Sequence, residues 1–184
     1  QGAWMLVSPS AIFGTIGGGQ LEFMAIDKAR EMLRDFSDEA LVLDIPLGPE
    51  IGQCCGGRVS VGIRLVDGEL REKLLRDAEA EDARLPHVYV FGGGHVGQAI
   101  ASALSLLPVH TIVVETRADA LEGMPETVQT RLTPVPEEMV REAPSGSAFV
   151  VLTHDHALDF LIVKEALRRD DAAYVGMIGS KTKK

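Results

Sequence analysis

The sequence predicts an α/β fold in two domains, of which the second is built on a parallel sheet. In the second half of the chain, short apolar runs alternate with helical patterns, which is typical of parallel strands joined by helical crossovers. Gly92, Gly94 and Gly97 form a turn of the spacing G-x-G-x-x-G between the first of these runs and the helix that follows. These features favour a Rossmann-like domain over 86–184, preceded by a smaller α/β domain over 1–85.

The first domain is expected to contain two pairs of strands and two helices. The first helix shows apolar residues at helical spacing, among them Leu21, Met24 and Met32, with Lys28 as the interruption. The second helix is highly charged, so we expect a surface or linker element ahead of the domain boundary. The expected strands are 3–7, 11–16, 40–45 and 58–66, and the expected helices are 20–36 and 69–84.

The glycine turn fixes the start of the second domain. Gly92 permits a tight turn out of the strand, Gly94 lets a pyrophosphate approach the backbone, and Gly97 lets the helix pack close to the strand. The N-terminus of that helix offers N–H groups to a phosphate. The expected strands are 87–91, 110–115, 127–132, 147–152 and 173–178, and the expected helices are 95–106, 136–142 and 157–169.

Composition argues against several classes of protein. The net charge of −9 repels nucleic acids and anionic membrane surfaces, and no apolar run approaches the roughly 20 residues of a membrane span. The two cysteines are adjacent and form no disulfide framework, so we expect a reducing, cytoplasmic location. The chain begins and ends in strand-like segments, from which we expect a piece of a longer protein, incomplete at the C-terminal end of its second domain.

Polar residues are concentrated where the expected parallel strands end, the edge at which open parallel sheets bind ligands. His95 follows the glycine turn, and Glu115 ends the second strand 18 positions after Gly97, where Rossmann domains carry the acid that binds a ribose diol. A carboxylate there favours NAD over NADP, although the neighbouring Arg117 keeps a phosphate possible. The alternative is a chance glycine turn beside a solvated glutamate.

The fourth strand ends in the segment Thr153-His154-Asp155-His156, with Asp159 shortly after it. Two histidines and two aspartates can ligate a metal or move protons. The alternative is a loop in which the threonine or the first aspartate caps the next helix.

The fifth strand ends near Ser180, which is followed by Lys181. These two side chains can meet an anion, or they form a basic end of the segment. The sequence has no Tyr-x-x-x-Lys pair, because Tyr89 and Tyr174 both fall inside expected strands. This argues against a simple dehydrogenase.

A second glycine turn, Gly17-Gly18-Gly19, leads into the first helix of the first domain. Its backbone N–H groups can receive an anion. The alternative is a tight connection in which Gln20 or Glu22 completes the helix cap.

The segment Gln53-Cys54-Cys55-Gly56-Gly57-Arg58 predicts a functional thiol. The glycines leave room around the cysteines, and a neighbouring arginine favours the thiolate, which binds soft metals and can carry sulfur. Without a second pair of Cys or His ligands the segment is no structural zinc site. The alternative is one core cysteine and one incidental cysteine.

Six motifs in this order closely resemble the XdhC/CoxI family of xanthine dehydrogenase accessory proteins, and the resemblance covers nearly the whole chain. The adjacent cysteines between glycines are its specific part. The motifs are Gly14–Glu22 (GTIGGGQLE), Gly52–Arg58 (GQCCGGR), Val90–Gly97 (VFGGGHVG), Glu115-x-Arg117, Thr153–Asp159 (THDHxxD) and Tyr174–Lys181 (YVGMIGSK).

The resemblance implies a protein that binds molybdenum cofactor and helps its sulfurated form reach a xanthine dehydrogenase-type apoenzyme, working with a cysteine desulfurase. It implies a chaperone more than a turnover enzyme, expected as a homodimer. Cys54 or Cys55 would contact the molybdenum end of the cofactor, and the glycine turns and strand-end residues would hold its phosphate and pterin. The residues expected to bind cofactor are Gly17, Gly18, Gly19, Gln53, Cys54, Cys55, Arg58, Gly92, Gly94, His95, Gly97, Glu115, Arg117, His154, Asp155, His156 and Ser180.

Two other functions remain open at the level of sequence. The glycine turn and Glu115 also suit an NAD-dependent oxidoreductase, or a regulatory module that senses NAD without transferring hydride.

Overall fold

A computed structural model describes residues 2–35, 39–48 and 56–179 of the 184-residue chain. The chain divides into two compact units, Gln1–Arg76 and Asp77–Lys184, and the division falls inside helix α2 (Gly68–Asp82). None of the residues of α2 is buried, as its charged sequence leads one to expect. The boundary expected between residues 85 and 86 lies just beyond the end of this helix.

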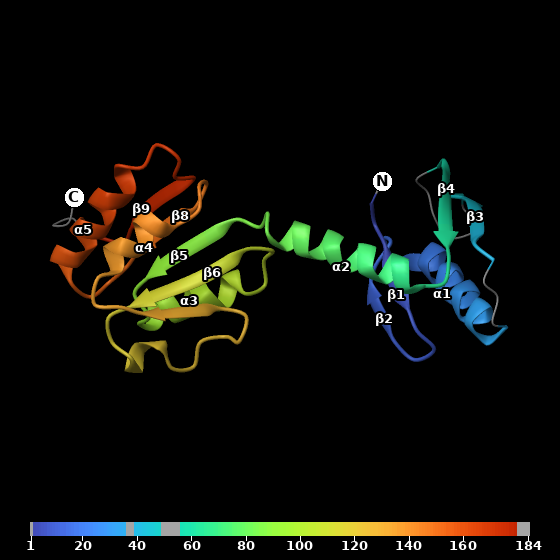
Figure 1. Ribbon diagram of the computed structural model, residues 1–184, viewed down its shortest axis with the longest axis horizontal. Helices are drawn as coiled ribbons and strands as arrows, with labels where there is room; N and C mark the ends of the chain where they lie inside the picture. Colours follow the sequence, from blue (N-terminus) through green and yellow to red (C-terminus); the bar gives the residue numbers. More distant parts are fainter. Residues whose placement is uncertain (1, 36–38, 49–55, 180–184) are drawn as a thin grey trace. The chain divides into compact units, whose positions relative to one another are not determined.

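The first unit contains two antiparallel strand pairs and one helix before α2 (Figure 1). Helix α1 buries Leu21, Ala25 and Met32, which recur at helical spacing and form its apolar face. The elements are β1 (Met5–Val7), β2 (Ile12–Gly14), α1 (Gly19–Arg34), β3 (Leu41–Pro46) and β4 (Arg58–Ile63).

The second unit is a five-stranded sheet, entirely parallel, in the order β7-β6-β5-β8-β9. The strand order reverses direction between β5 and β8, so the loops that follow these two strands leave the same edge of the sheet side by side. The elements are β5 (His87–Phe91), α3 (His95–Leu104), β6 (His110–Glu115), the 3-10 helix η2 (Asp119–Leu121), β7 (Gln129–Leu132), α4 (Pro136–Glu142), β8 (Ala148–Val151), α5 (His156–Leu167) and β9 (Tyr174–Met177).

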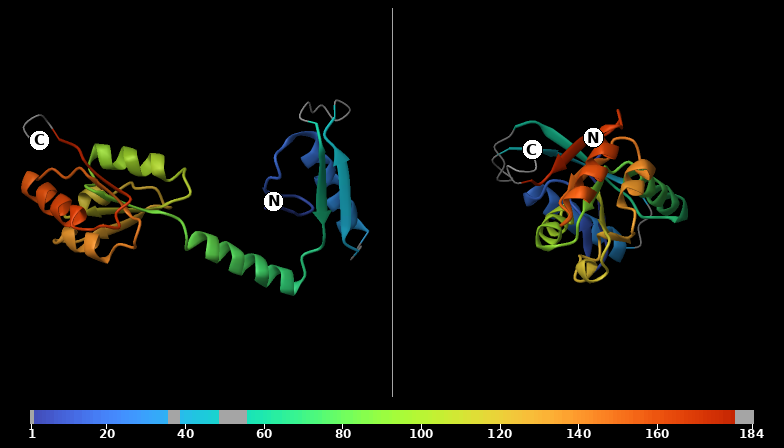
Figure 2. Two further views of the ribbon diagram at one scale, coloured as in Figure 1. Left: turned by 90° about the horizontal axis from the view of Figure 1, so that it is seen from above. Right: turned by 90° about the vertical axis from the view of Figure 1, so that its left-hand side faces the viewer.

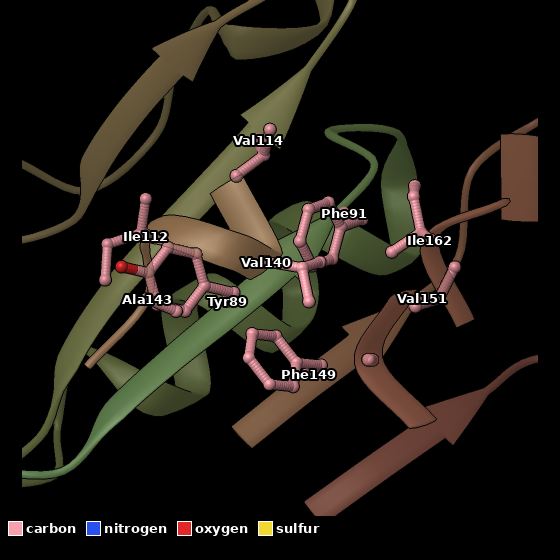
Figure 3. Close-up of a cluster of buried hydrophobic side chains, with 10 residues drawn as sticks. Tyr89, Phe91, Ile112, Val114, Val140, Ala143, Phe149, Val151 and Ile162 are labelled. Atoms are coloured by element: carbon pink, nitrogen blue, oxygen red, sulfur yellow. The ribbon is translucent and has the colours of Figure 1, made fainter. Parts of the chain in front are cut away.

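Helices cover both faces of this sheet. Alternate side chains of β5 and β6 point to opposite faces, so Val90 and Val113 pack with Ala101 of α3, whereas Phe91 packs towards α4 and α5. Figure 2 shows α3, in yellow-green, and the orange pair α4 and α5 on opposite sides of the sheet. Figure 3 shows the larger core, where aromatic rings of β5 and β8 meet aliphatic side chains of α4 and α5; its labelled members are Tyr89, Phe91, Ile112, Val114, Val140, Ala143, Phe149, Val151 and Ile162.

The structure confirms the α/β class and every expected strand and helix, with ends that shift by a few residues. The strand expected over 11–16 ends at Gly14, because the backbone of Ile16 turns to donate to the Glu22 carboxylate instead of a strand partner. The 3-10 helix η2 was not expected. Among the described residues, no helix is both long and apolar enough to cross a membrane.

Candidate functional site at the carboxyl edge of the parallel sheet

The glycine turn after β5 is held in place by close backbone contacts. Gly92 has φ 114°, a conformation that favours glycine, and a Cβ there would lie 2.6 Å from the carbonyl oxygen of Leu152. A Cβ on Gly97 would lie 1.9 Å from the carbonyl oxygen of Gly92, so only glycine lets α3 approach the turn this closely. The roles expected for these two glycines are therefore met in the structure.

Gly94 differs from its neighbours, because a Cβ built on it meets no described atom within 4 Å. Gly94 and His95 are both exposed. Gly94 occupies the N-cap position of α3. Among the described residues, no side chain caps the first N–H groups of α3, which lie at the carboxyl edge of the sheet. This is the arrangement that receives a phosphate in other proteins.

Glu115, at the end of β6, is turned into the protein and only 4% exposed. Its Oε2 accepts from the N–H of Gly93 at 2.9 Å, and its Oε1 accepts from the N–H of Thr116 at 2.8 Å and of Arg117 at 3.1 Å. Burial alone raises the pKa of this carboxyl group, but these donors together with the Arg117 guanidinium outweigh it and lower the pKa to about 2. The carboxylate is therefore charged and pinned to the glycine turn.

The loop after β8 is organised by two aspartates. Asp155 is the N-cap of α5, and its carboxylate accepts from the N–H groups of Ala157 and Leu158. Asp159 is fully buried and accepts from both the N–H (3.0 Å) and the hydroxyl (2.7 Å) of Thr153. This is the geometry of the capping alternative for the segment.

The two histidines of this loop lie outside that network of hydrogen bonds. His154 and His156 are exposed, and Nδ1 of His156 lies 3.9 Å from Oδ2 of Asp159. Within the part of the chain that the structure describes, no three His, Cys, Asp or Glu side chains are grouped so that they could hold a metal ion.

The turn in the first unit is occupied by a carboxylate of the chain itself. Oε2 of Glu22 accepts from the N–H groups of Ile16 (2.9 Å) and Gly18 (3.1 Å) and from the Thr15 hydroxyl. The hydroxyl first, and then these N–H groups, lower the pKa of Glu22. This is the arrangement of the alternative interpretation, in which Glu22 completes the cap of α1.

Three of the expected site residues, Gln53, Cys54 and Cys55, lie outside the described residues, and so does Ser180. Arg58 is described: its guanidinium pairs with Asp44 across the β3–β4 hairpin, Nη2 to Oδ2 at 3.1 Å, and both side chains are more than half exposed.

The structure thus gathers one group of the expected residues at one edge of one sheet. The group comprises Gly92, Gly94, His95, Gly97, Glu115, Arg117, His154, Asp155 and His156. The residues 17–19 and Arg58 belong to the other unit. Two depressions among the described residues, of about 240 and 190 Å³, lie elsewhere, one beside α1 and one near the start of β5.

Sequence reasoning missed Gly93 and Thr116. A Cβ on Gly93 would lie 2.4 Å from the carbonyl oxygen of Ala120, so the turn is pressed against η2, and the Gly93 N–H points to Glu115. The only sign of this contact in the sequence was the third glycine, between Gly92 and Gly94. Every residue type except proline has a backbone N–H, so the donor itself cannot be recognised from the sequence.

Two family models match the chain. One, described as the XdhC Rossmann domain, covers residues 88–184, and the other, described as the XdhC and CoxI family, covers residues 1–43. The first alone spans more than half of the chain. The chain belongs to the XdhC and CoxI family.

A solved structure shares the fold of this chain over its full length. A crystal structure described as a xanthine dehydrogenase from Bacillus halodurans matches 100% of this chain and 74% of that chain, with a TM-score of 0.81 at 18% identity. RSP, a Rex-family repressor, matches at 15% identity with 89% of each chain covered and a TM-score of 0.36. No curated protein sequence matches the chain significantly.

Proposed function

We propose that this XdhC-family protein is an accessory protein that binds molybdenum cofactor and assists its sulfuration and insertion into a xanthine dehydrogenase-type apoenzyme. Membership of the family supports the accessory role. The positions of the two tyrosines agree with it, since Tyr89 lies in β5 and Tyr174 in β9, away from the carboxyl edge where a hydride-transfer residue would be needed.

The observation that carries the proposal is the open N-terminus of α3. The cofactor ends in a phosphate, and the backbone at Gly94, His95 and Val96 offers it N–H groups and the positive end of the helix dipole. Arg117, half-exposed beside the turn, adds a positive charge near the same edge. When bound, the cofactor carries a molybdenum centre on soft sulfur ligands, and the protein delivers this centre to its client.

The thiol segment is proposed to take part in the sulfuration of the cofactor. A thiolate at Cys54 or Cys55 is a soft ligand and suits molybdenum and its sulfur chemistry. The partners that this role requires are the apoenzyme and a cysteine desulfurase, and we propose that the protein acts as a cytoplasmic homodimer.

The test is retention of molybdenum by the purified protein. Wild-type protein, Gly94→Ala, Cys54→Ala and Cys55→Ala are incubated with cofactor released from a molybdoenzyme, and co-eluting molybdenum is measured. Gly94→Ala places a methyl group where the phosphate approaches, so retention should fall by about tenfold or more, the cost of one charge-assisted hydrogen bond. Gly68→Ala, at a glycine whose Cβ also meets no described atom within 4 Å, is the matched control.

The outcomes separate the parts of the proposal. No retention by the wild-type protein overturns cofactor binding. Full retention in both cysteine variants removes the thiol role, and full retention in Gly94→Ala removes the phosphate site.

A second candidate is NAD binding, favoured by the spacing of Gly92, Gly94 and Gly97 and by the acid that follows at Glu115. Titration with NAD and NADH tests it. Binding without hydride transfer would indicate a sensing module, and no binding at millimolar ligand would exclude both forms of this candidate.

A further inference from the structure

The acid at the end of β6 has no hydrogen-bonding capacity left for a ribose. An ionised carboxylate offers about four lone-pair sites. Glu115 already accepts five hydrogen bonds: Oε1 from the N–H and hydroxyl of Thr116 and the N–H of Arg117, and Oε2 from the N–H of Gly93 and from Nη2 of Arg117. A vicinal diol would have to displace at least two of these donors.

Access to the carboxylate is restricted as well. Its side chain is 4% exposed, and the Gly93 turn that covers it is wedged against η2, where a Cβ would approach the Ala120 carbonyl oxygen to 2.4 Å. The turn therefore cannot move towards η2 to expose the carboxylate. Displacing Gly93 would leave a buried N–H without a partner, which is costly.

We propose that Glu115 is a positioning residue that holds the glycine turn, and that the turn binds a phosphate monoester without recognition of a ribose diol by Glu115. Glu115 fixes Gly93, and Gly93 fixes the direction of the N–H groups at Gly94 and His95 that follow it. The ligand class rests on the proposed function, in which this turn receives a phosphate. The positioning role does not.

Amide hydrogen exchange on the ligand-free protein, followed by NMR, tests the positioning role. Glu115→Gln puts an NH₂ group against backbone donors, so the Gly93 amide should exchange at least about tenfold faster than in the wild-type protein. Glu126→Gln, which removes an exposed carboxylate of the same unit, should leave this rate unchanged. Equal Gly93 rates in wild type and Glu115→Gln would overturn the positioning role.

The wild-type protein provides a second measurement if Glu115→Gln does not fold. The Gly93 amide proton shift should follow the titration of the Glu115 carboxyl group, because the two are hydrogen-bonded. A Gly93 shift that is flat through this titration would equally overturn the proposal.

The ligand class is tested with AMP and 2′,3′-dideoxy-AMP, which differ only in the diol. We expect the wild-type protein to bind both with dissociation constants within about twofold, since no diol reaches Glu115. AMP binding about tenfold tighter, with the preference lost in Glu115→Gln, would overturn the proposal. If neither binds, the phosphate site of the proposed function falls together with the ligand class, whereas the Gly93 exchange result still decides the positioning role.

Discussion

Single carboxylates hold three turns of this protein in shape. Glu22 accepts from the turn ahead of α1, Glu115 from the turn after β5, and Asp159 from Thr153 in the loop after β8. In each case a side-chain oxygen accepts from backbone N–H groups that no helix or sheet pairs. Two of the glycine-rich turns thus have a carboxylate of the chain itself among their N–H groups, while the N–H groups at the start of α3 have no side-chain cap among the described residues.

The pH dependence of stability should reveal the Glu115 contacts. Because its pKa is about 2 in the folded protein and 4.5 ordinarily, the ionised carboxylate stabilises the fold above pH 4.5, and this contribution is lost as the pH falls towards 2. The difference in unfolding free energy between wild type and Glu115→Gln should be on the order of 3 kcal/mol at pH 7 and shrink below pH 4.5. Urea titrations at several pH values measure it.

Glu126→Gln serves as the control, because the Glu126 carboxylate is exposed. The difference in unfolding free energy between this variant and the wild-type protein should be the same at every pH. A Glu115→Gln difference that does not change between pH 7 and pH 3 would contradict the prediction.

The cap of α5 should contribute measurable stability. Asp155→Ala removes the acceptor of the Ala157 and Leu158 N–H groups, and we expect unfolding free energy to fall by about 1 kcal/mol. Asp155→Asn keeps an acceptor oxygen and should lose less than half of that amount. His154→Ala, next to the cap and exposed, should be neutral. Chemical denaturation measures the unfolding free energy of the three variants. An Asp155→Ala variant as stable as the wild-type protein would show that the cap contributes nothing.

At the scale of elements, the packing of α3 on β5 depends on one glycine. In Gly97→Ala the new methyl group would lie 1.9 Å from the Gly92 carbonyl oxygen. Both groups are attached directly to the backbone, so neither can rotate away to relieve the overlap. We expect a loss of about 3 kcal/mol or more in unfolding free energy, because α3 must shift away from the sheet. Gly94→Ala, three residues earlier in the open part of the turn, should unfold within about 0.5 kcal/mol of wild type. Thermal unfolding of both variants compares them, and equal stability would refute the packing argument.

The elements themselves were largely predictable from the sequence, because their signals are local. The apolar run before Gly92 and the helical spacing of Leu21 and Met32 each act over one strand or one helix. The 3-10 helix η2 was not predicted, because its three residues are too few to show a periodic pattern of apolar side chains. The positions of polar residues at the strand ends were predictable too, and Glu115 and Asp155 lie there in the structure.

What those side chains contact was not predictable from the sequence. The pairing of Glu115 with the N–H of Gly93 spans 22 positions and depends on β5 and β6 lying side by side. The choice between a ligand site and a helix cap at Asp155 depends likewise on a rotamer, which spacing does not encode. The residues at the edge of the sheet could therefore be identified from the sequence, but the contacts they make could be determined only from the structure.

For the whole molecule, the distribution of the core between the two units determines what can fold alone. Among the described residues, the two large clusters of buried side chains belong to the second unit, one on each face of the parallel sheet. The proposed function draws on residues of both units, because the turn proposed to bind phosphate lies in the second and the thiol segment in the first. A fragment of the second unit should therefore fold without being able to replace the whole chain in cofactor retention.

A fragment of residues 77–184 should unfold cooperatively by itself, because the core packing among its described residues lies within 88–177. Phe149 is fully buried there, with Tyr89 and Phe91 on the neighbouring strand β5 and the Arg169 guanidinium 5.8 Å from its ring centre. Phe149→Ala should cost about 3–5 kcal/mol, equally in the fragment and in the full chain. Phe160→Ala, at a side chain 53% exposed, should cost less than about 1 kcal/mol. A fragment that melts without cooperativity would show that the sheet needs residues ahead of position 77, and a Phe149→Ala cost that differs between fragment and full chain would show that the first unit contributes to this core.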